Sequence, residues 1–210
     1  MFKESITPKE LEQFEFATCP GKIIVIDSVG AEFNRAIAYL RSQKIIGFDT
    51  ETRPTFTPSQ PRYSVSLLQL SGMDKSYLFR INKIGMHRRL CALLASDKIV
   101  KVGAAIHDDI RGLQKLREFI PASFVDLQKI VWEWGIRDKS VKKMAAIILG
   151  IRISKTQQLS NWEAETLSES QCKYAATDAW VCREMYKKLL ASEKNPLPPV
   201  IPGDVDESKK

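Results

Sequence analysis

Residues 44–52 read KIIGFDTET, and this stretch decides the fold. It begins with β-branched and aromatic residues, which are typical of a strand, and ends with the acidic residues Asp49 and Glu51. Residues i and i+2 of a strand point to the same face, so the two carboxylates lie together. Negative charge beside an apolar core is costly unless a cation compensates it, which favours a divalent metal. A single D-x-E pair more often begins a solvated loop, so further acidic residues are needed to support this interpretation.

Short apolar runs bounded by turn residues occur on both sides of this strand. They predict further strands at residues 23–26, 63–70, 76–79 and 98–103. Helical spacing of apolar residues follows, in segments centred near Ile37, Leu93, Leu113, Ile147 and Val181. Strands interleaved with helices predict an α/β fold with a mixed β-sheet flanked by helices.

The length of 210 residues suits one domain with one hydrophobic core. We expect an N-terminal extension at residues 1–22, a main domain at residues 23–192 and a disordered tail at residues 193–210. The last residues read NPLPPVIPGDVDESKK, which is rich in proline and charge and cannot hold a helix. The tail is therefore left out of the predicted fold.

The composition is that of an ordinary soluble globular protein, with 44% hydrophobic and 27% charged residues. The N-terminus lacks the apolar core of a secretion signal, and no run approaches the ~20 apolar residues of a membrane span. We therefore expect a cytoplasmic protein with no membrane partner. The cysteines show no C-x-x-C spacing, which argues against a zinc site. A net charge of +7 is compatible with a nucleic-acid partner but does not identify one.

Two further segments carry acidic residues in helical context. Tyr174 and Asp178 lie one turn apart in KYAATDAW and share a helix face, and the alanines between them allow close approach to a sheet. Asp108 and Asp109 follow the apolar run KVGAAIH at the start of another helix, where aspartate is a frequent N-cap. We expect one of these two aspartates to cap the helix and the other to serve the site. Taken alone, each pattern is more often structural than functional.

Together these segments resemble a known family. FDTET, KVGAAIHDDIRGL and YAATD are similar, in this order, to the three exonuclease motifs of the DEDD superfamily, whose fold resembles ribonuclease H. The last motif is of the DEDDy kind, because Tyr174 stands four positions before Asp178. In the sister DEDDh group a histidine precedes the last aspartate by five positions, where this chain has Lys173. VSLLQL and SKTQQLSNW resemble segments of the ribonuclease D and Werner-type exonuclease families.

The resemblance implies a ribonuclease H-like fold and a 3′-5′ exonuclease that uses two Mg²⁺ or Mn²⁺ ions and no organic cofactor. It implies that Asp49 bridges both ions and that Glu51 and Asp178 complete the site of the water-activating ion. Asp109, selected over its neighbour by the family pattern, would support the second ion through water. Tyr174 would orient the attacking water. Ligation by carboxylates alone suits these hard cations better than zinc.

The residues expected to bind the nucleic acid are Arg53, Arg62 and Lys155. The first two belong to a proline-rich loop that either lines the path of the strand or is a solvated connection, and Lys155 precedes the last motif. Similarity of SNW and YAATDA to Werner-type domains favours DNA over RNA, although the choice depends on 2′-hydroxyl contacts that no motif encodes. A ribonuclease D-like RNA-processing enzyme, a catalytically silent nucleic-acid-binding module and a proofreading subunit of a separate polymerase are the alternatives.

Overall fold

The computed structural model of the chain describes residues 1–57 and 63–198. Its centre is a six-stranded sheet in the order β1-β4-β3-β2-β5-β6. The strands are β1 (Lys22–Ile26), β2 (Ile45–Thr52), β3 (Val65–Ser71), β4 (Lys75–Arg80), β5 (Val100–Gly103) and β6 (Phe124–Asp126). β3 runs antiparallel to both of its neighbours, and the other neighbouring pairs are parallel. The sheet is therefore mixed, as the sequence predicts.

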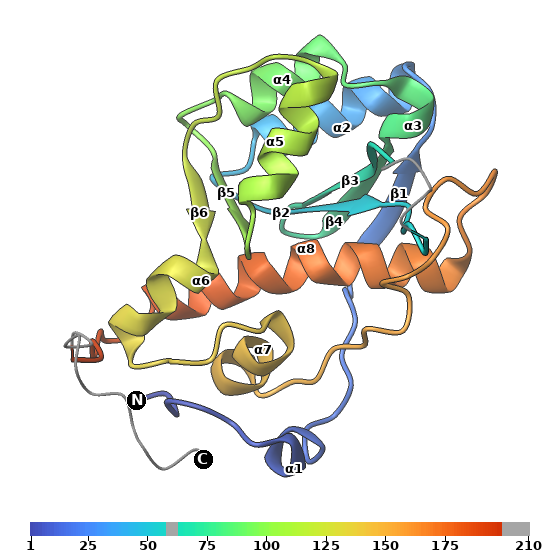
Figure 1. The fold of residues 1–210 in the computed structure, drawn as a ribbon. Coiled ribbons are helices and arrows are strands. Elements are labelled where there is room, and N and C mark those ends of the chain that lie inside the picture. Colours follow the sequence, from blue (N-terminus) through green and yellow to red (C-terminus); the bar gives the residue numbers. More distant parts are fainter. Residues whose placement is uncertain (58–62, 199–210) are drawn as a thin grey trace.

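Helices cover both faces of this sheet. They are α1 (Pro8–Leu11), α2 (Ala31–Arg41), α3 (Ile81–Ile84), α4 (Arg88–Leu94), α5 (His107–Leu116), α6 (Leu127–Ile130), the 3-10 helix η1 (Val131–Trp134), α7 (Val141–Leu149) and α8 (Glu169–Leu190). In Figure 1, α2, α4 and α5 lie on one side of the sheet, and α8 runs along the other side with α7 and α1 beyond it. In the two described ranges, no helix combines the length and the apolar character that crossing a bilayer requires.

The alternation of side chains along β2 separates packing from chemistry. Phe48 points into the core beneath α2, α4 and α5. Gly47, Asp49 and Glu51 face α8 instead. A β-carbon at Gly47 would come within 1.8 Å of the carbonyl oxygen of Ala179, so α8 lies directly against this strand. This close approach brings the carboxylates of β2 beside those of the helix.

The sequence of α8 explains how it lies so close. Its N-terminus is fixed by a capping box, in which the side chain of Ser168 accepts a hydrogen bond from the backbone of the first turn. The helix face turned to the sheet carries Ala175, Ala176 and Ala179, all with no exposed surface. Side chains this small keep the helix axis near the strands, and this places Asp178 over the end of β2.

The expected terminal segments both contact the domain. Ile6 and Leu11, in the expected N-terminal extension, are buried. In residues 193–198, the backbone N–H groups of Asn195 and Leu197 donate hydrogen bonds to carbonyl oxygens of η1. The first part of the expected tail thus follows the surface of the domain, and residues 199–210 lie outside the described residues.

Candidate active site

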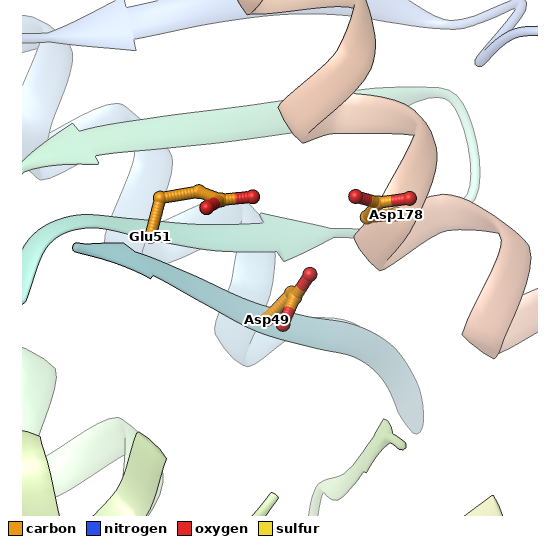
Figure 2. Close-up of side chains that lie close together, drawn as sticks. All are labelled: Asp49, Glu51 and Asp178. Carbon is orange, nitrogen blue, oxygen red and sulfur yellow. The ribbon is translucent and has the colours of Figure 1, made fainter. Parts of the chain in front are cut away.

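Three carboxylates meet where the end of β2 passes beneath α8. Asp49 and Glu51 come from the strand and Asp178 from the helix, and one oxygen of each lies within 4.8 Å of the others. Figure 2 shows the three side chains turned toward a shared space. They line a cavity of about 210 Å³ together with Tyr174 and Lys155. A set of carboxylate oxygens at this spacing fits a hard divalent cation.

Burial and mutual repulsion dominate the electrostatics of these acids. Burial, followed by the negative charges of Asp178, Glu51 and Asp109, raises the pKa of Asp49 well above its usual range. Burial and the charges of Asp178 and Asp109 raise the pKa of Glu51 to about 9. The pKa of Asp178 is also raised by burial, against the opposing hydrogen bond from Tyr174. The metal-free site therefore retains protons at neutral pH, and a bound cation would displace them.

Asp109 lies in the first turn of α5, outside this close cluster. One of its carboxylate oxygens accepts a hydrogen bond from the hydroxyl of Thr50, which points to the face of β2 opposite Asp49. Its charge nevertheless raises the pKa of both Asp49 and Glu51. Asp109 thus contacts the face of β2 that carries Thr50, and it remains within electrostatic range of Asp49 and Glu51.

The expectation that Asp108 or Asp109 caps α5 is wrong. The helix is capped by Ile106, without a side-chain hydrogen bond, and both aspartates lie inside the first turn. There their charges favour the helix through its dipole. The preceding turn is held at Ala105, which adopts a left-handed φ of 57° and donates its N–H to Asp126 at the end of β6. This contact fixes where α5 begins and therefore where Asp109 lies.

Tyr174 is half-buried between the acids and the loop that precedes α8. It lines the same cavity as Asp178, one helical turn away on α8, and its ring lies 6.0 Å from the ring of Trp162 at an angle of 32°. Burial, followed by the charges of Asp178 and Glu51, raises the pKa of Tyr174. The phenol therefore stays protonated at neutral pH, which makes it a hydrogen-bonding group rather than a general base.

The three residues expected to bind nucleic acid differ in their surroundings. Lys155 is exposed at the rim of the cavity. Arg53 lies 3.4 Å from the carboxylate of Glu163 and stacks 4.7 Å above the ring of Tyr63. Arg62 lies outside the described residues. Lys155 is the residue of this group whose charge lies at the site, where it lowers the pKa of Asp178.

Sequence reasoning missed several residues that shape the site. Thr50, Gln158 and Cys182 line the cavity, and Thr50 also binds Asp109. Thr50 was visible in the FDTET motif as the residue between the two acids, with its side chain on the opposite face. Cys182 stands one helical turn after Asp178, so helical spacing could have placed it in the cavity. Gln158 lies in an irregular loop, which has no period that could have revealed it.

A mixed sheet crossed by one long helix, with an all-carboxylate site between them, is the arrangement of ribonuclease H-like nucleases. The EXO domain of Nibbler from Aedes aegypti has the same fold, with a TM-score of 0.71 and 24% identity over 83% of this chain and 91% of that domain. The chain belongs to the 3′-5′ exonuclease family, whose model matches residues 25–192.

Two curated relatives extend the comparison. Exonuclease 3′-5′ domain-containing protein 2 of Drosophila melanogaster is 34% identical over 150 residues, which are 70% of this chain and 25% of the relative. Ribonuclease D of Gluconacetobacter diazotrophicus is 28% identical over 170 residues, 79% of this chain and 42% of the relative. The chain therefore spans less than half the length of each of these two relatives.

Proposed function

We propose that this chain removes nucleotides one at a time from the 3′ end of single-stranded or 3′-terminal DNA, with two Mg²⁺ or Mn²⁺ ions held by its acidic residues. The observation that carries the proposal is the cluster of Asp49, Glu51 and Asp178 within 4.8 Å, with Asp109 beyond it. A catalytically silent module is disfavoured, because every acid of the motifs is present. Residues 23–192 would form the catalytic domain.

Bound ions would activate water and stabilise the leaving oxygen of the scissile phosphate. Asp49 is suited to hold both ions, because its carboxylate lies within 4.8 Å of those of Glu51 and Asp178 and is also in electrostatic range of Asp109. Glu51 and Asp178 would complete one ion site. Asp109 would support the other through water, since it stands outside the close cluster and is oriented by Thr50.

Tyr174 would place the attacking water. Its side chain lines the cavity beside Asp178, and the protonated phenol can donate or accept a hydrogen bond. The tilted ring of Trp162 restricts the orientation of the phenol. Tyr174 would therefore act by orienting the water rather than by taking its proton.

Basic residues would guide the strand to this cavity. Lys155 stands at the rim, where an ammonium group could meet a phosphate. Arg53 could contribute if the strand displaces Glu163, its present partner at 3.4 Å. Arg62 is proposed from the sequence alone. The similarity to Werner-type domains favours DNA, and ribonuclease D among the relatives supports RNA as the second candidate.

Matched DNA and RNA oligonucleotides test this function. With a 5′ label and Mg²⁺ or Mn²⁺, we expect a ladder that shortens one nucleotide at a time and releases 5′-mononucleotides, faster for DNA. A 3′-phosphate should inhibit, because it would add negative charge beside the acidic cluster at which the 3′ end is expected to bind. A closed circular strand should not be hydrolysed, because it has no free 3′ end. Rapid cutting of the circle would contradict exonuclease polarity, and faster loss of the RNA would reverse only the choice of substrate.

A further inference from the structure

A buried glutamine lies in the sheet directly behind the acids. Gln69, in β3, has no exposed surface. Neither its amide nitrogen nor its amide oxygen has a hydrogen-bond partner among the described residues. Buried polar side chains are nearly always hydrogen-bonded, because an unpaired amide in the core is costly. Gln69 therefore needs an explanation that packing does not provide.

The register of the sheet places Gln69 beside Asp49. These two residues face each other across the antiparallel pair β2 and β3, just as Ser71 faces Gly47 two residues away. Directly opposite residues share a face of the sheet, with β-carbons about 4.5–5.5 Å apart. A glutamine side chain is long enough to bring its amide to the carboxylate of the aspartate from that distance.

Other partners for the amide are few. On the far side Gln69 faces Leu78, which belongs to a cluster with Leu67, Ala175 and Ala176 against which Tyr174 also packs. The neighbouring hydroxyl of Ser71 is already engaged with the hydroxyl of Ser76 and the carbonyl oxygen of Ala176. Asp49 is thus the acceptor that the sheet itself presents to the amide nitrogen.

Asp49 also has acceptor capacity to spare. One of its oxygens accepts the backbone N–H of Thr50 at 3.0 Å. A carboxylate offers further lone pairs beyond that bond and a metal contact. Donors behind a metal-binding carboxylate fix its orientation and favour its ionised form.

We propose that Gln69 is a positioning residue, whose amide nitrogen donates a hydrogen bond to the carboxylate of Asp49 when that carboxylate holds metal. This inference rests on the proposed metal site. It explains why an amide is kept among leucines and alanines: a bound metal would keep the Asp49 carboxylate ionised and oriented as the acceptor to which the amide is not bonded in the metal-free structure. The amide stabilises the metal-bound state at the expense of the metal-free fold.

Replacement by an apolar side chain of similar length separates the two effects. Gln69→Met should unfold in EDTA at the same temperature as wild type or higher, because an unpaired buried amide is removed. Its dissociation constant for Mn²⁺, measured by calorimetry without nucleic acid, should rise roughly 10-fold. Exonuclease activity should recover at high Mn²⁺. A merely structural role would instead lower the unfolding temperature and leave Mn²⁺ affinity unchanged.

Ser71→Ala is the matched control, because it alters a buried polar side chain on the same strand and face, opposite Gly47 rather than Asp49. Its Mn²⁺ affinity should equal that of wild type. Asp49→Ala tests the metal site separately. If it binds Mn²⁺ like wild type, the proposed site itself fails. If it loses Mn²⁺ while Gln69→Met retains wild-type affinity, only the role of Gln69 is overturned.

A measurement on the wild-type protein covers the case in which Gln69→Met fails to fold. In NMR spectra, the side-chain amide protons of Gln69 should shift and exchange more slowly with solvent when Mg²⁺ is added. The same titration of Asp49→Ala should leave them unchanged. If the chemical shifts and exchange rates of these amide protons in the wild type do not change with Mg²⁺, the proposal is overturned.

Discussion

The two faces of the central sheet differ in the side chains that they carry. The face beneath α2, α4 and α5 is filled with large apolar side chains, among them Phe48, Leu68, Leu70 and Phe79. The face beneath α8 carries the acids of β2 and Gln69 of β3, and the helix meets this face with buried alanines. Neighbouring residues of one strand thus serve different purposes.

This difference indicates that stability and activity are separable at single positions. Large side chains on the first face form one continuous apolar cluster, and their loss leaves cavities. The second face places unfavourable charge near the core, and a cation would compensate that charge. Substitutions on the first face should change folding, and substitutions on the second should change chemistry.

Phe48→Ala should have the largest effect on folding. Phe48 has no exposed surface and packs edge-to-face against Phe124 at 5.1 Å. Removing the ring should lower the free energy of unfolding by about 3–5 kcal/mol, measured by urea denaturation. Activity per folded molecule should fall far less. Phe48→Leu, which keeps most of the volume, should lose much less stability, and equal losses in both variants would argue against a cavity effect.

Tyr174→Phe should act on the other face and slow hydrolysis roughly 10- to 1000-fold. The ring and its contact with Trp162 remain, so the unfolding temperature should change little. Mn²⁺ affinity should also survive, since the phenol is not among the clustered carboxylates. Steady-state rates from pH 6 to 9 measure the effect. A Phe variant as fast as wild type across this range would remove Tyr174 from the mechanism.

Glu51→Gln should stabilise the metal-free protein in a pH-dependent way. The pKa of Glu51 is raised to about 9, so in EDTA the folded state retains a proton that the unfolded chain loses near its ordinary pKa of about 4.3. The wild type therefore loses stability as pH rises from about 5 toward 9. The Gln variant avoids this loss. We expect equal unfolding temperatures near pH 4 and a gain of a few kcal/mol at pH 8, less than the roughly 5 kcal/mol of the full pKa shift because the cavity is open to solvent.

Saturating Mn²⁺ should reverse that order, because the wild type gains binding energy that the Gln variant loses. Thermal unfolding in EDTA and in Mn²⁺ gives both measurements on one sample. A Gln variant that is no more stable than wild type at pH 8 in EDTA would show that Glu51 is not repelled by its neighbours.

Lys155→Ala should have the smallest effect. Loss of one phosphate contact should weaken binding of a single-stranded oligonucleotide a few-fold and reduce the salt slope by about 0.7. Filter binding between low and moderate salt measures both. Lys98 is an exposed lysine just before β5, at the end of the sheet away from the acids. Lys98→Ala should therefore change neither the binding affinity nor the salt slope. Equal salt slopes for the two variants would show that the bound oligonucleotide does not contact Lys155.

The elements long enough to show a repeating pattern of apolar residues were predicted from the sequence, together with the motif residues that lie on them. The alternation in KIIGFDTET placed Asp49 and Glu51 on one face, and helical spacing paired Tyr174 with Asp178. β6 was not predicted, because three residues show no alternation. The helices α1, α3 and α6 were not predicted either, because four residues are too few to show a helical period.

Contacts between distant segments could not be predicted from either pattern. The pairing of Arg53 with Glu163 joins residues 110 positions apart, and the side chain of Asp126 reaches the turn at Ala105 from another strand. Gln69 is part of a run, VSLLQL, that predicts a strand, yet only the register with β2 shows that it faces Asp49. Such contacts depend on the order of strands in the sheet, which periodicity does not encode.

Asp49→Ala tests the central claim most directly when hydrolysis and unfolding are measured on the same preparation. We expect hydrolysis of a 5′-labelled oligonucleotide to fall by a factor on the order of 10³ or more, because the carboxylate between the two proposed ion sites is gone. The unfolding temperature in EDTA should be unchanged or higher, because a buried repulsion is relieved. A well-folded Asp49→Ala protein with wild-type hydrolysis would contradict the account.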